Sequence, residues 1–239
     1  IAQIWPYGIV LFLLNKLFNI KYTIFILGEE LSTVVLNKSF KSRIIQIFYR
    51  KIVNSSSHVF AYSSFVKHNI QRLFSNKYNG DISVFSIGLD VDSFTNKKIN
   101  FHNNFKPERN KVILFSISRH IERKGFFNLI EALRLLDQEN KNWHQYIAGI
   151  GPLTSKLKQK VEDEGLANSV TFLDKISESE LHACYKNSDI FLLPNIILDN
   201  GDADGCPIVF IEASAYGVPC IGGDVPGTED AIIDGKTGF

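Results

Sequence analysis

The sequence has few cysteines and no excess of either charge. Three of its 239 residues are cysteines, Cys184, Cys206 and Cys220, and none of them forms a Cys-x-x-Cys pair. So few thiols argue against a disulfide framework or a zinc site and suit a reducing cytoplasm. The formal net charge is +1. No strong overall field therefore favours nucleic acid or an anionic membrane, and anion binding must depend on local cations.

The sequence also lacks methionine and any long apolar run. The most apolar stretch, Ile9–Phe18, is interrupted by Asn15 and Lys16, whereas a membrane-spanning helix needs roughly 20 apolar residues. It has no small-residue cleavage site of a signal peptide either, so we predict a buried helix. The chain begins at Ile1 and ends at a turn signal followed by Phe239. We expect both ends to be truncated.

The first half alternates short apolar runs with helical patterns. In the helix expected near Lys41, Ile44, Ile47, Phe48 and Ile52 share one stripe, as in a helix with one apolar face toward a core. We predict strands at Tyr22–Leu27, His58–Tyr62 and Ser83–Ile87, and helices at Ile9–Phe18, Lys41–Val53 and Phe65–Phe74.

The second half repeats the pattern with stronger signals. The run Ser177–Glu180 has the form of a capping box and opens a helix that ends at Asn187. The other helices are expected at Gly125–Leu136, from Pro152 to about Gly165, and in the stretch that ends at Gly217. We predict strands at Lys111–Ser118, Gln145–Ala148, Val170–Leu173, Asp189–Leu193 and Val218–Ile221.

Short apolar strands that alternate with helices indicate crossover units and a parallel sheet. Two such series predict an α/β protein with two Rossmann-like, doubly wound sheets, both incomplete. Residues from about Asp90 to Asn110 are polar, with few apolar anchors. We therefore predict a partial first domain at 1–95, a linker at 96–110 and a second domain at 111–239.

Two cations follow the first strand of the second series. Arg119 comes directly after the strand Lys111–Ser118, and Lys124 stands at the start of the next helix. Ligands of open parallel sheets bind beyond the carboxyl ends of the strands. Two cations and a helix N-terminus directed at one point suit a diphosphate, although two solvated surface charges are an equally good interpretation of these residues alone.

Two glycine-rich loops also follow strands of the second half. Gly149-Ile150-Gly151-Pro152 could let backbone N–H groups approach an anion, but the full G-x-G-x-x-G fingerprint is absent and a tight turn is the simpler interpretation. The loop Gly222–Asp230 leads to a helix expected near Thr228, with acids in its first turn. Because these acids repel phosphate, sugar hydroxyls fit this loop better.

Two acids flank the start of another helix. Asp204 precedes the helix, and Glu212 lies eight positions later among apolar neighbours. At 1.5 Å per residue their Cα atoms lie roughly 12 Å apart, beyond the carboxylate spacing of glycosidases. The pair could hold separate parts of one long ligand. The simpler interpretations are a partner of the helix dipole for Asp204 and an exposed charge for Glu212, but an acid on a buried helix needs a partner.

The residues from Ser118 to Phe239 resemble the C-terminal half of glycosyltransferase family 4, the retaining enzymes of GT-B fold. The first half matches more loosely, at Gly28-Glu29-Glu30, Ala61-Tyr62-Ser63 and Gly88-Leu89-Asp90 with Phe94. The matching pieces of the second half are Arg119 with Lys124-Gly125, Gly149 to Pro152, Asp189 to Pro194, Asp204-Gly205 through Glu212-Ala213, Gly217 to Pro219, and Pro226-Gly227.

The resemblance implies a role for each of these residues. Arg119 and Lys124 hold the donor diphosphate, and Asp204 and Glu212 fill the two acidic positions of the family's E-x7-E motif as the catalytic pair. The first acid contacts the donor sugar and the second the ribose. No metal and no cofactor is implied, because cations and a helix terminus stabilise the leaving diphosphate. The remaining donor-binding residues that it implies are Gly149, Gly151, Ile176, Gly205, Cys206, Pro207, Ile208 and Val209.

The sequence departs from the family at two positions. Asp204 stands where the family usually has Glu, so its carboxylate has a shorter reach, and Leu27 stands where the family often has His before Gly28. The family's N-terminal glycine-rich strand-loop and its returning C-terminal helix have no counterpart in the chain. We expect the fragment on its own to be inactive.

The resulting prediction is a glycosyltransferase that moves a sugar from a nucleotide-sugar donor to an acceptor hydroxyl with retention. The acceptor is a sugar, a lipid-linked sugar or a glycan, in polysaccharide, lipopolysaccharide or glycolipid synthesis. The expected location is the cytoplasm, including peripheral contact with the cell membrane through the absent regions. The alternatives are a non-catalytic nucleotide-sugar-binding module and a sugar-nucleotide epimerase; a dehydrogenase is disfavoured by the missing fingerprint.

Overall fold

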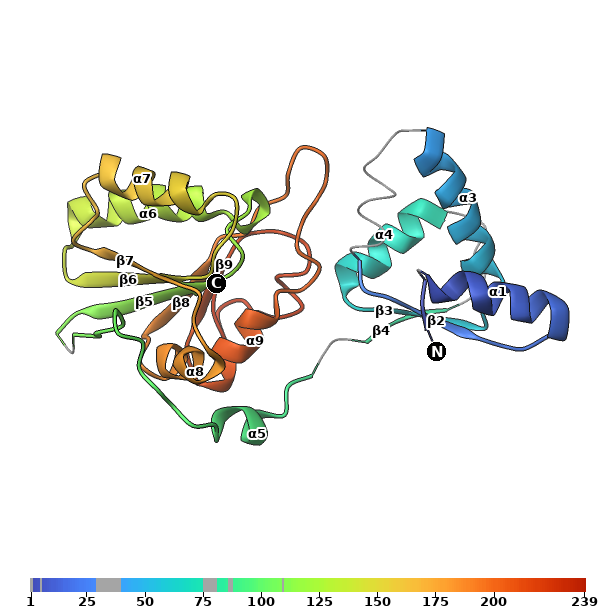
Figure 1. Cartoon of the computed structure of the whole chain (residues 1–239), viewed down its shortest axis with the longest axis horizontal. Coiled ribbons are helices and arrows are strands. Elements are labelled where there is room, and N and C mark those ends of the chain that lie inside the picture. The colour runs from blue at the N-terminus through green and yellow to red at the C-terminus, as the bar shows by residue number, and fades with distance from the viewer. Residues whose placement is uncertain (1, 5, 29–39, 75–80, 86–87, 109) are drawn as a thin grey trace. The chain divides into compact units, whose positions relative to one another are not determined.

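The computed structural model describes residues 2–4, 6–28, 40–74, 81–85, 88–108 and 110–239 (Figure 1). The chain divides into two compact units, each built around its own parallel sheet. The first unit comprises Ile1–Ile87 and Asp199–Cys206, and the second comprises Gly88–Leu198 and Pro207–Phe239. The prediction of an α/β protein with parallel sheets is confirmed.

The first unit has a four-stranded parallel sheet in the order β1-β2-β3-β4. Right-handed crossovers between sequential strands place the connecting helices on one face of the sheet. Alternate residues of β2 and β3 are buried, as expected of strands with one covered face. The strands are β1 (Ala2–Gln3), β2 (Thr23–Ile26), β3 (His58–Ala61) and β4 (Ile82–Val84), and the helices are α1 (Tyr7–Phe18), α3 (Phe40–Asn54) and α4 (Ser64–Phe74).

Two predictions about the first unit are wrong, and both concern which side of a helix is buried. Gly8 is the only buried residue among the described residues of α1, so this helix is largely exposed. In α3, Ile44, Ile47 and Phe48 are exposed, whereas Ile52 is buried. The buried side of α3 consists of Ser42, Tyr49, Ile52 and Val53. Because α3 has apolar residues on more than one side, its period alone could not identify the side that meets the sheet.

Parts of the first-half pattern lie outside the described residues. Glu29 and Glu30, which follow β2, are among them. So is the end of the strand predicted at Ser83–Ile87, and the strand that the structure has there is β4, Ile82–Val84.

The second unit has a five-stranded parallel sheet in the order β7-β6-β5-β8-β9. Helices α6 and α7 cover one face, and α8 and α9 cover the other (Figure 1). Strand order reverses between β5 and β8, which is the switch point of a doubly wound sheet. The strands are β5 (Val112–Ile117), β6 (Trp143–Ala148), β7 (Val170–Asp174), β8 (Ile190–Leu193) and β9 (Cys220–Gly222), and the helices are α6 (Phe126–Glu139), α7 (Thr154–Asp163), α8 (Glu178–Lys186) and α9 (Ile208–Ala215).

Aromatic side chains fill the core of the second unit. Phe115 of β5 meets Tyr185 and Phe191 edge-on, and Phe191 meets Phe210 of α9 in the same way. All four side chains are fully buried. Complete burial of each apolar side chain contributes about 1.5–3 kcal/mol, so these contacts hold α8 and α9 on the sheet.

The predicted start of α8 is confirmed in detail. The Ser177 side chain accepts from the Glu180 backbone N–H, and the Glu180 carboxylate accepts from the Ser177 backbone N–H at 2.7 Å. These bonds from Ser177 hold the pKa of Glu180 below its usual value. The capping box therefore places the first turn of α8 beyond the end of β7.

The helix expected near Thr228 is wrong. Residues 226–231 form turns, in which the Thr228 N–H donates to the Val225 carbonyl oxygen at 3.1 Å and the Ala231 N–H donates to the Thr228 carbonyl oxygen at 2.9 Å. Gly227, directly before Thr228, has a φ of +99°, which lies outside the helical region.

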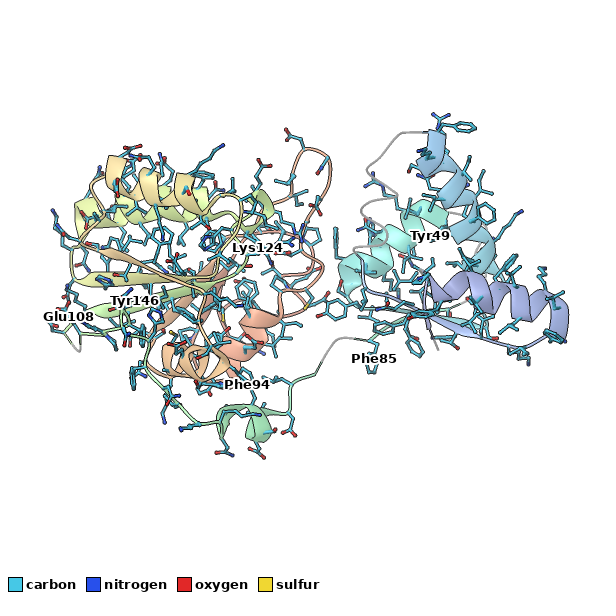
Figure 2. The ribbon with its side chains drawn as sticks, in the orientation of Figure 1. Tyr49, Phe85, Phe94, Glu108, Lys124 and Tyr146 are labelled. Atoms are coloured by element: carbon cyan, nitrogen blue, oxygen red, sulfur yellow. The ribbon has the colours of Figure 1, made fainter. Side chains whose placement is uncertain are left out.

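The polar stretch from about Asp90 to Asn110 groups with the second unit. It contains a short helix, α5 (Val91–Thr95), which Asp90 caps by accepting from the Ser93 N–H at 3.1 Å. Phe94 of α5 packs edge-on against His182 and Tyr216 (Figure 2). Phe105 is 2% exposed and packs edge-on against Tyr146. Phe94 and Phe105 thus attach the segment to the second unit, whereas Val91 and Phe101 are exposed.

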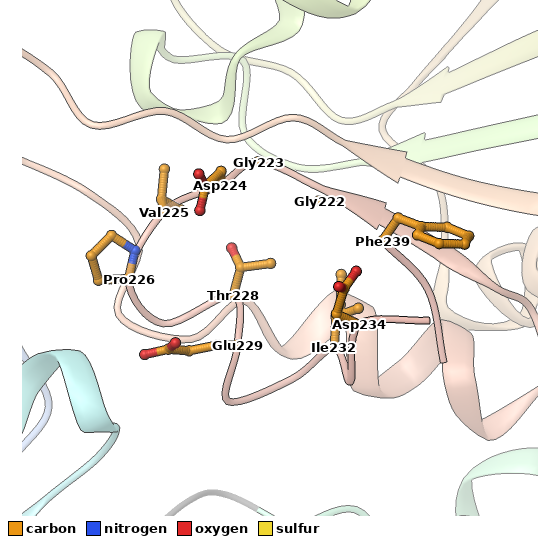
Figure 3. A pocket seen from close by; sticks show the side chains of 10 residues that line it. All are labelled: Gly222, Gly223, Asp224, Val225, Pro226, Thr228, Glu229, Ile232, Asp234 and Phe239. Atoms are coloured by element: carbon orange, nitrogen blue, oxygen red, sulfur yellow. The ribbon is translucent and has the colours of Figure 1, made fainter. Parts of the chain in front are cut away.

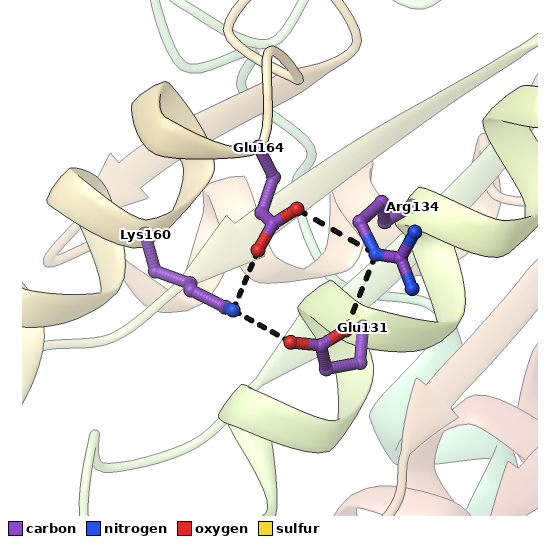
Figure 4. Close-up of polar contacts among 4 residues, drawn as sticks. All are labelled: Glu131, Arg134, Lys160 and Glu164. Atoms are coloured by element: carbon purple, nitrogen blue, oxygen red, sulfur yellow. Dashed lines mark hydrogen bonds and ion pairs between the residues drawn. The ribbon is translucent and has the colours of Figure 1, made fainter.

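Charges of both signs cover the outward side of α6 and α7. The Lys160 ammonium contacts the carboxylates of Glu131 and Glu164, each at 2.6 Å, and the Arg134 guanidinium contacts the same two acids (Figure 4). These contacts lower the pKa of Glu131 and raise the pKa of Lys160. The network links two helices at the surface and is not a binding site.

We predict that Phe94→Ala loosens α5. The substitution should lower the free energy of unfolding of the second unit by about 1–3 kcal/mol, because a half-buried aromatic side chain loses its contacts with His182 and Tyr216. Val91→Ala, on an exposed side of α5, is the matched control and should change stability by less than about 0.5 kcal/mol. Equal effects of the two variants in chemical denaturation would contradict the anchoring role of Phe94.

Candidate functional site

The site residues of the second unit gather at the carboxyl ends of its strands. All pairings in this sheet are parallel, so the loops that follow its strands emerge at one edge. The loop after β5 has Arg119 and Lys124, and the loop after β8 leads to the N-terminus of α9. These two loops lie on either side of the switch point, where doubly wound sheets bind ligands.

Glycines bring the loops after β5 and β6 into direct backbone contact. Gly149 has a φ of +109°, and a Cβ at this position would overlap the carbonyl group of Ser118. A Cβ on Gly151 would lie 2.5 Å from the His120 carbonyl oxygen. The His120 N–H donates to the Ile150 carbonyl oxygen at 3.3 Å, so the two loops are also hydrogen-bonded.

These contacts explain Gly149 and Gly151 without a ligand. The Gly149 N–H donates to the Asp174 carbonyl oxygen at 2.6 Å, and the Gly151 N–H donates to the Thr154 hydroxyl at 2.9 Å. Both N–H groups that the sequence offered for anion binding therefore have partners within the protein. A donor-binding role for these glycines stays a prediction, and the structure shows them as spacers between adjacent loops.

Glycines also join the loops after β5, β8 and β9. A Cβ on Gly125 would overlap the Pro194 carbonyl group, and a Cβ on Gly223 would overlap that of Asn195. The Ile196 N–H donates to the Arg123 carbonyl oxygen at 2.9 Å, and the Gly223 N–H donates to the Asn195 side-chain oxygen at 3.1 Å. A chain of backbone contacts thus runs along this edge of the sheet.

The two predicted cations lie on this framework. Arg119 is exposed and lies two residues after the end of β5, whereas Lys124 is half-buried and ends a short 3-10 helix at Glu122–Lys124 (Figure 2). Gly125, with a φ of +68°, closes that turn and begins α6. Lys124 therefore sits directly before the residue that packs on Pro194, at the β5 side of the switch point.

His120 separates Arg119 from the core and was not singled out from the sequence. Its ring is fully buried, lies edge-on to Phe126, and has Nδ1 2.9 Å from the Thr154 hydroxyl. Burial lowers its pKa, so the ring is neutral at neutral pH and does not add charge to the cation pair.

Glu212 has the partner that its apolar surroundings require. It is half-buried in α9, and one of its carboxylate oxygens accepts from the Tyr185 hydroxyl at 2.8 Å. Burial and the nearby carboxylate raise the pKa of Tyr185 well above its usual value, so the phenol remains the donor. Glu212 lies four residues after Ile208, about 6 Å along the helix from its N-terminus.

The other residues of the acidic segment belong to two different units. Asp204, Gly205 and Cys206 group with the first unit, whereas Pro207, Ile208 and Val209 group with the second. Asp204 and Cys206 are buried. Pro207 is the N-cap residue of α9, whose first turn has no acid. The positive end of the α9 dipole is therefore not neutralised by a side chain of that turn.

Two further predicted residues lie near the same edge. Ile176 is half-buried against the core just beyond β7, which ends two strands away from β5. Beside it Asp174 adopts a φ of +54° and pairs with Lys158 at 2.8 Å.

The loop after β9 encloses a pocket of about 460 Å³ (Figure 3). Its size is typical of a small-molecule site. Three carboxylates, Asp224, Glu229 and Asp234, line it together with the edge of Phe239. Three carboxylates disfavour a phosphate here, and a neutral, hydroxyl-bearing ligand part at this loop stays a prediction. Thr228 at its base is buried and accepts from the Asn195 side chain at 3.3 Å.

The described part of the chain shows no cluster of side chains of the kind that binds a metal ion. There, no group of three or more His, Cys, Asp or Glu residues could hold a metal ion. The three cysteines are buried and unbridged, and burial raises the pKa of Cys184 to about 12 and that of Cys220 to about 11. These thiols are therefore poor nucleophiles and poor metal ligands.

The sheet order and its switch point define a doubly wound α/β unit of the Rossmann type. The family described as Glycosyl transferases group 1 matches residues 96–239. The chain belongs to this family.

Relatives with similar sequences are named as glycosyltransferases. A putative colanic acid biosynthesis glycosyltransferase of Salmonella typhimurium is 30% identical over 66% of this chain and 37% of its own length. The GDP-mannose-dependent α-(1-6)-phosphatidylinositol monomannoside mannosyltransferase of Mycolicibacterium smegmatis is 36% identical over 54% of this chain and 34% of its own. The chain thus spans about a third of the length of these relatives.

Solved structures show the same fold at lower identity. Sucrose-phosphate synthase from Thermosynechococcus elongatus matches 99% of this chain with a TM-score of 0.73 and 19% identity, over 58% of its own chain. The Anabaena protein HepE in complex with UDP-glucose matches 97% with a TM-score of 0.69 and 18% identity, over 61% of its own chain. The prediction of a GT-B fold is confirmed by these likenesses.

We predict that Gly149→Ala destabilises the second unit by about 3 kcal/mol or more, because the new Cβ meets the Ser118 carbonyl group at a strained φ. Gly165→Ala is the matched control: its φ is +71° and no atom lies within 4 Å of the added Cβ. The control should cost only the strain of its backbone, about 1 kcal/mol. Denaturation curves that shift equally for both variants would disprove the close-contact role of Gly149.

Proposed function

We propose that the whole protein is a retaining glycosyltransferase of family 4 that uses a nucleotide-sugar donor. The observation that carries the proposal is the pair of cations, Arg119 and Lys124, on the β5 side of the switch point. The N-terminus of α9, without an acid in its first turn, follows the strand on the other side. Two cations and a helix dipole at the ends of adjacent strands favour a diphosphate.

In the proposed complex, Arg119 and Lys124 bind the diphosphate, together with backbone groups from Gly205 to Val209. Glu212 binds the ribose hydroxyls, and Asp204 binds the donor sugar. Ile176 borders the nucleotide base, and the loops that begin at Gly149 and Gly222 border the phosphates and the sugar respectively.

The proposed reaction exchanges one bond of the anomeric carbon for another. Its bond to the diphosphate oxygen breaks, a bond to the acceptor oxygen forms on the same face of the sugar, and the proton of the acceptor hydroxyl passes to the departing diphosphate or to water. The departing diphosphate gains negative charge, which the cations and the α9 N-terminus stabilise without a metal ion or another cofactor. The reaction is a substitution at one carbon, so it needs no oxidant and no reductant.

The proposed acceptor is a hydroxyl of a growing glycan or a lipid-linked sugar, in the synthesis of a polysaccharide, lipopolysaccharide or glycolipid at the cytoplasmic face of the membrane. The named relatives act in colanic acid synthesis and on a phosphatidylinositol monomannoside, which supports this class of acceptor. Release of nucleoside diphosphate by the full-length protein should depend on such an acceptor. Donor binding without this release would favour a non-catalytic binding module.

We expect Arg119→Ala and Lys124→Ala each to weaken binding of a nucleoside diphosphate by about 1.5–3 kcal/mol, the value of a hydrogen bond to a charged group. Titration calorimetry with the full-length protein measures this change. Lys156→Ala, on the exposed side of α7, removes the same charge away from the strand ends and should leave the affinity unchanged. Unchanged affinity in both site variants would overturn the proposed diphosphate site.

We expect Glu212→Gln to weaken binding of the nucleoside diphosphate itself, and Asp204→Asn to impair only binding or transfer of the sugar. Tyr185→Phe removes the hydroxyl that holds Glu212 and should weaken diphosphate binding by about 1–2 kcal/mol. Titrations with the free diphosphate and with the nucleotide sugar separate these effects. If Glu212→Gln and Asp204→Asn bind the diphosphate equally and turn over normally, the proposed division of roles is wrong.

A further inference from the structure

A row of aromatic side chains leads from α5 to Glu212. Phe94 of α5 lies edge-on to His182 of α8, with ring centroids 4.7 Å apart, and edge-on to Tyr216 at 5.9 Å. Tyr216 in turn stacks on Tyr185, with an angle of 18° between the ring planes. The Tyr185 hydroxyl donates to the Glu212 carboxylate at 2.8 Å. We call Phe94, His182, Tyr216 and Tyr185 the aromatic row.

Helical spacing places the members of the row beside one another. His182 and Tyr185 are three residues apart on α8, and Tyr216 is the C-cap residue of α9, four positions after Glu212. Helices α8 and α9 lie on the same face of the sheet, with α5 next to them (Figure 1). Tyr185 is fully buried between Phe115 of β5 and Tyr216. Because buried side chains are closely packed, a change at Tyr216 reaches the Tyr185 ring by direct contact.

His182 supplies the polar contact that fixes Tyr216. Its ring is fully buried, and its Nδ1 lies 2.8 Å from the Tyr216 hydroxyl. Its Nε2 is also buried and lies 3.7 Å from a Glu178 carboxylate oxygen, which is too long for a hydrogen bond. The negative charge of that carboxylate favours a proton on Nε2, so Nδ1 accepts from the Tyr216 hydroxyl. The imidazole therefore holds the Tyr216 ring where Phe94 covers both side chains.

The segment that contains Phe94 is fastened to α8 as well. The Asn100 backbone N–H donates to the Ser179 carbonyl oxygen, and the Asn100 side-chain amide donates to the Ser179 hydroxyl, each at 3.2 Å. The second unit begins at Gly88, so α5 is the first helix after the chain enters this unit. The row thus joins the entering segment to the middle of α9.

The polar atoms of the row are unfavourable for packing alone. A buried nitrogen without a hydrogen bond, such as Nε2 of His182, destabilises a core, and an apolar side chain there would avoid this loss. Hydrogen bonds from Tyr216 and Tyr185 instead give each ring one orientation. A carboxylate that binds two hydroxyls of one sugar needs such a fixed position, because small displacements weaken oriented contacts.

We propose that His182 and Tyr216 are positioning residues for the ribose of the donor. They act through the Tyr185 hydroxyl on Glu212, and Phe94 holds them in place. The inference rests on the proposed function, in which Glu212 binds the ribose hydroxyls. The segment that enters the second unit therefore takes part in donor binding without touching the donor. The diphosphate, bound by the cations after β5, does not depend on the row.

Titration calorimetry with the full-length protein tests the proposal with probes that have or lack ribose hydroxyls. The probes are UDP, GDP, their 2′,3′-dideoxy forms and inorganic pyrophosphate. Tyr216→Leu should weaken binding of UDP or GDP about tenfold, because Tyr185 loses its stacking partner and Glu212 loses a fixed hydrogen bond. Tyr216→Phe keeps the ring and should weaken binding only about threefold. Affinities for the dideoxy forms and for pyrophosphate should stay unchanged, since neither has hydroxyls for Glu212.

Two further comparisons test the route from α5 to Glu212. Phe94→Ala should weaken binding of UDP or GDP about threefold or more, whereas Val91→Ala, on an exposed side of the same helix, should leave it unchanged. In a Tyr185→Phe background, Tyr216→Leu should cause no further loss, because the hydroxyl through which it acts is absent. Thermal unfolding of each variant shows that it is folded at the temperature of the titration.

Three results would overturn this inference and leave the proposed function intact. One is normal affinity of Tyr216→Leu for UDP and GDP. The second is an equal loss of affinity for pyrophosphate, which would show that the row only stabilises the fold. The third is an additive loss when Tyr216→Leu is combined with Tyr185→Phe. By contrast, an unchanged protein that binds neither UDP nor GDP, or normal affinity of Glu212→Gln, would overturn the proposed function and with it the inference.

Discussion

The close approach of backbones between successive strand-end loops determines the geometry of the second unit. Gly149, Gly125 and Gly223 each stand where a side chain would overlap a carbonyl group of the adjacent loop. Because glycine has no Cβ, the loops after β5, β6, β8 and β9 can touch one another at one edge of the sheet. Hydrogen bonds from backbone N–H groups join them. This packing of the loops fixes the backbone on which Arg119, Lys124 and the α9 N-terminus lie.

Much of this framework could be predicted from the sequence. Continuous apolar runs such as Val112–Ile117 require burial on both faces, and their alternation with amphipathic helices leads to a parallel sheet. The carboxyl-end rule then predicted that Arg119 and Lys124 lie in a loop after a strand end, and the structure has both in the loop after β5. It could also be argued that Glu212 needed a partner, but not that the partner was Tyr185, because their contact joins residues 27 positions apart on two packed helices.

Other features of the structure could not be predicted from the order of apolar and polar residues in the sequence. A stripe such as Ile44, Ile47 and Phe48 shows that one side of a helix is apolar, but not whether that side meets the sheet or another surface. Phe94 and Phe105 are isolated apolar residues in a polar stretch, so periodicity did not reveal them as anchors. Acids after Thr228 suggested a helix start, whereas the positive φ of Gly227 produced consecutive turns.

The grouping of Asp199–Cys206 with the first unit has a mechanical consequence. The polypeptide passes between the two units after residues 87, 198 and 206, so no single cleavage would separate them into intact halves. Any reorientation of the first unit involves all three crossings, and one of them lies directly before Pro207, the N-cap residue of α9. The first unit is thereby covalently joined to the N-terminus of α9. A movement of that unit would act directly on the helix end whose dipole is proposed to bind the diphosphate.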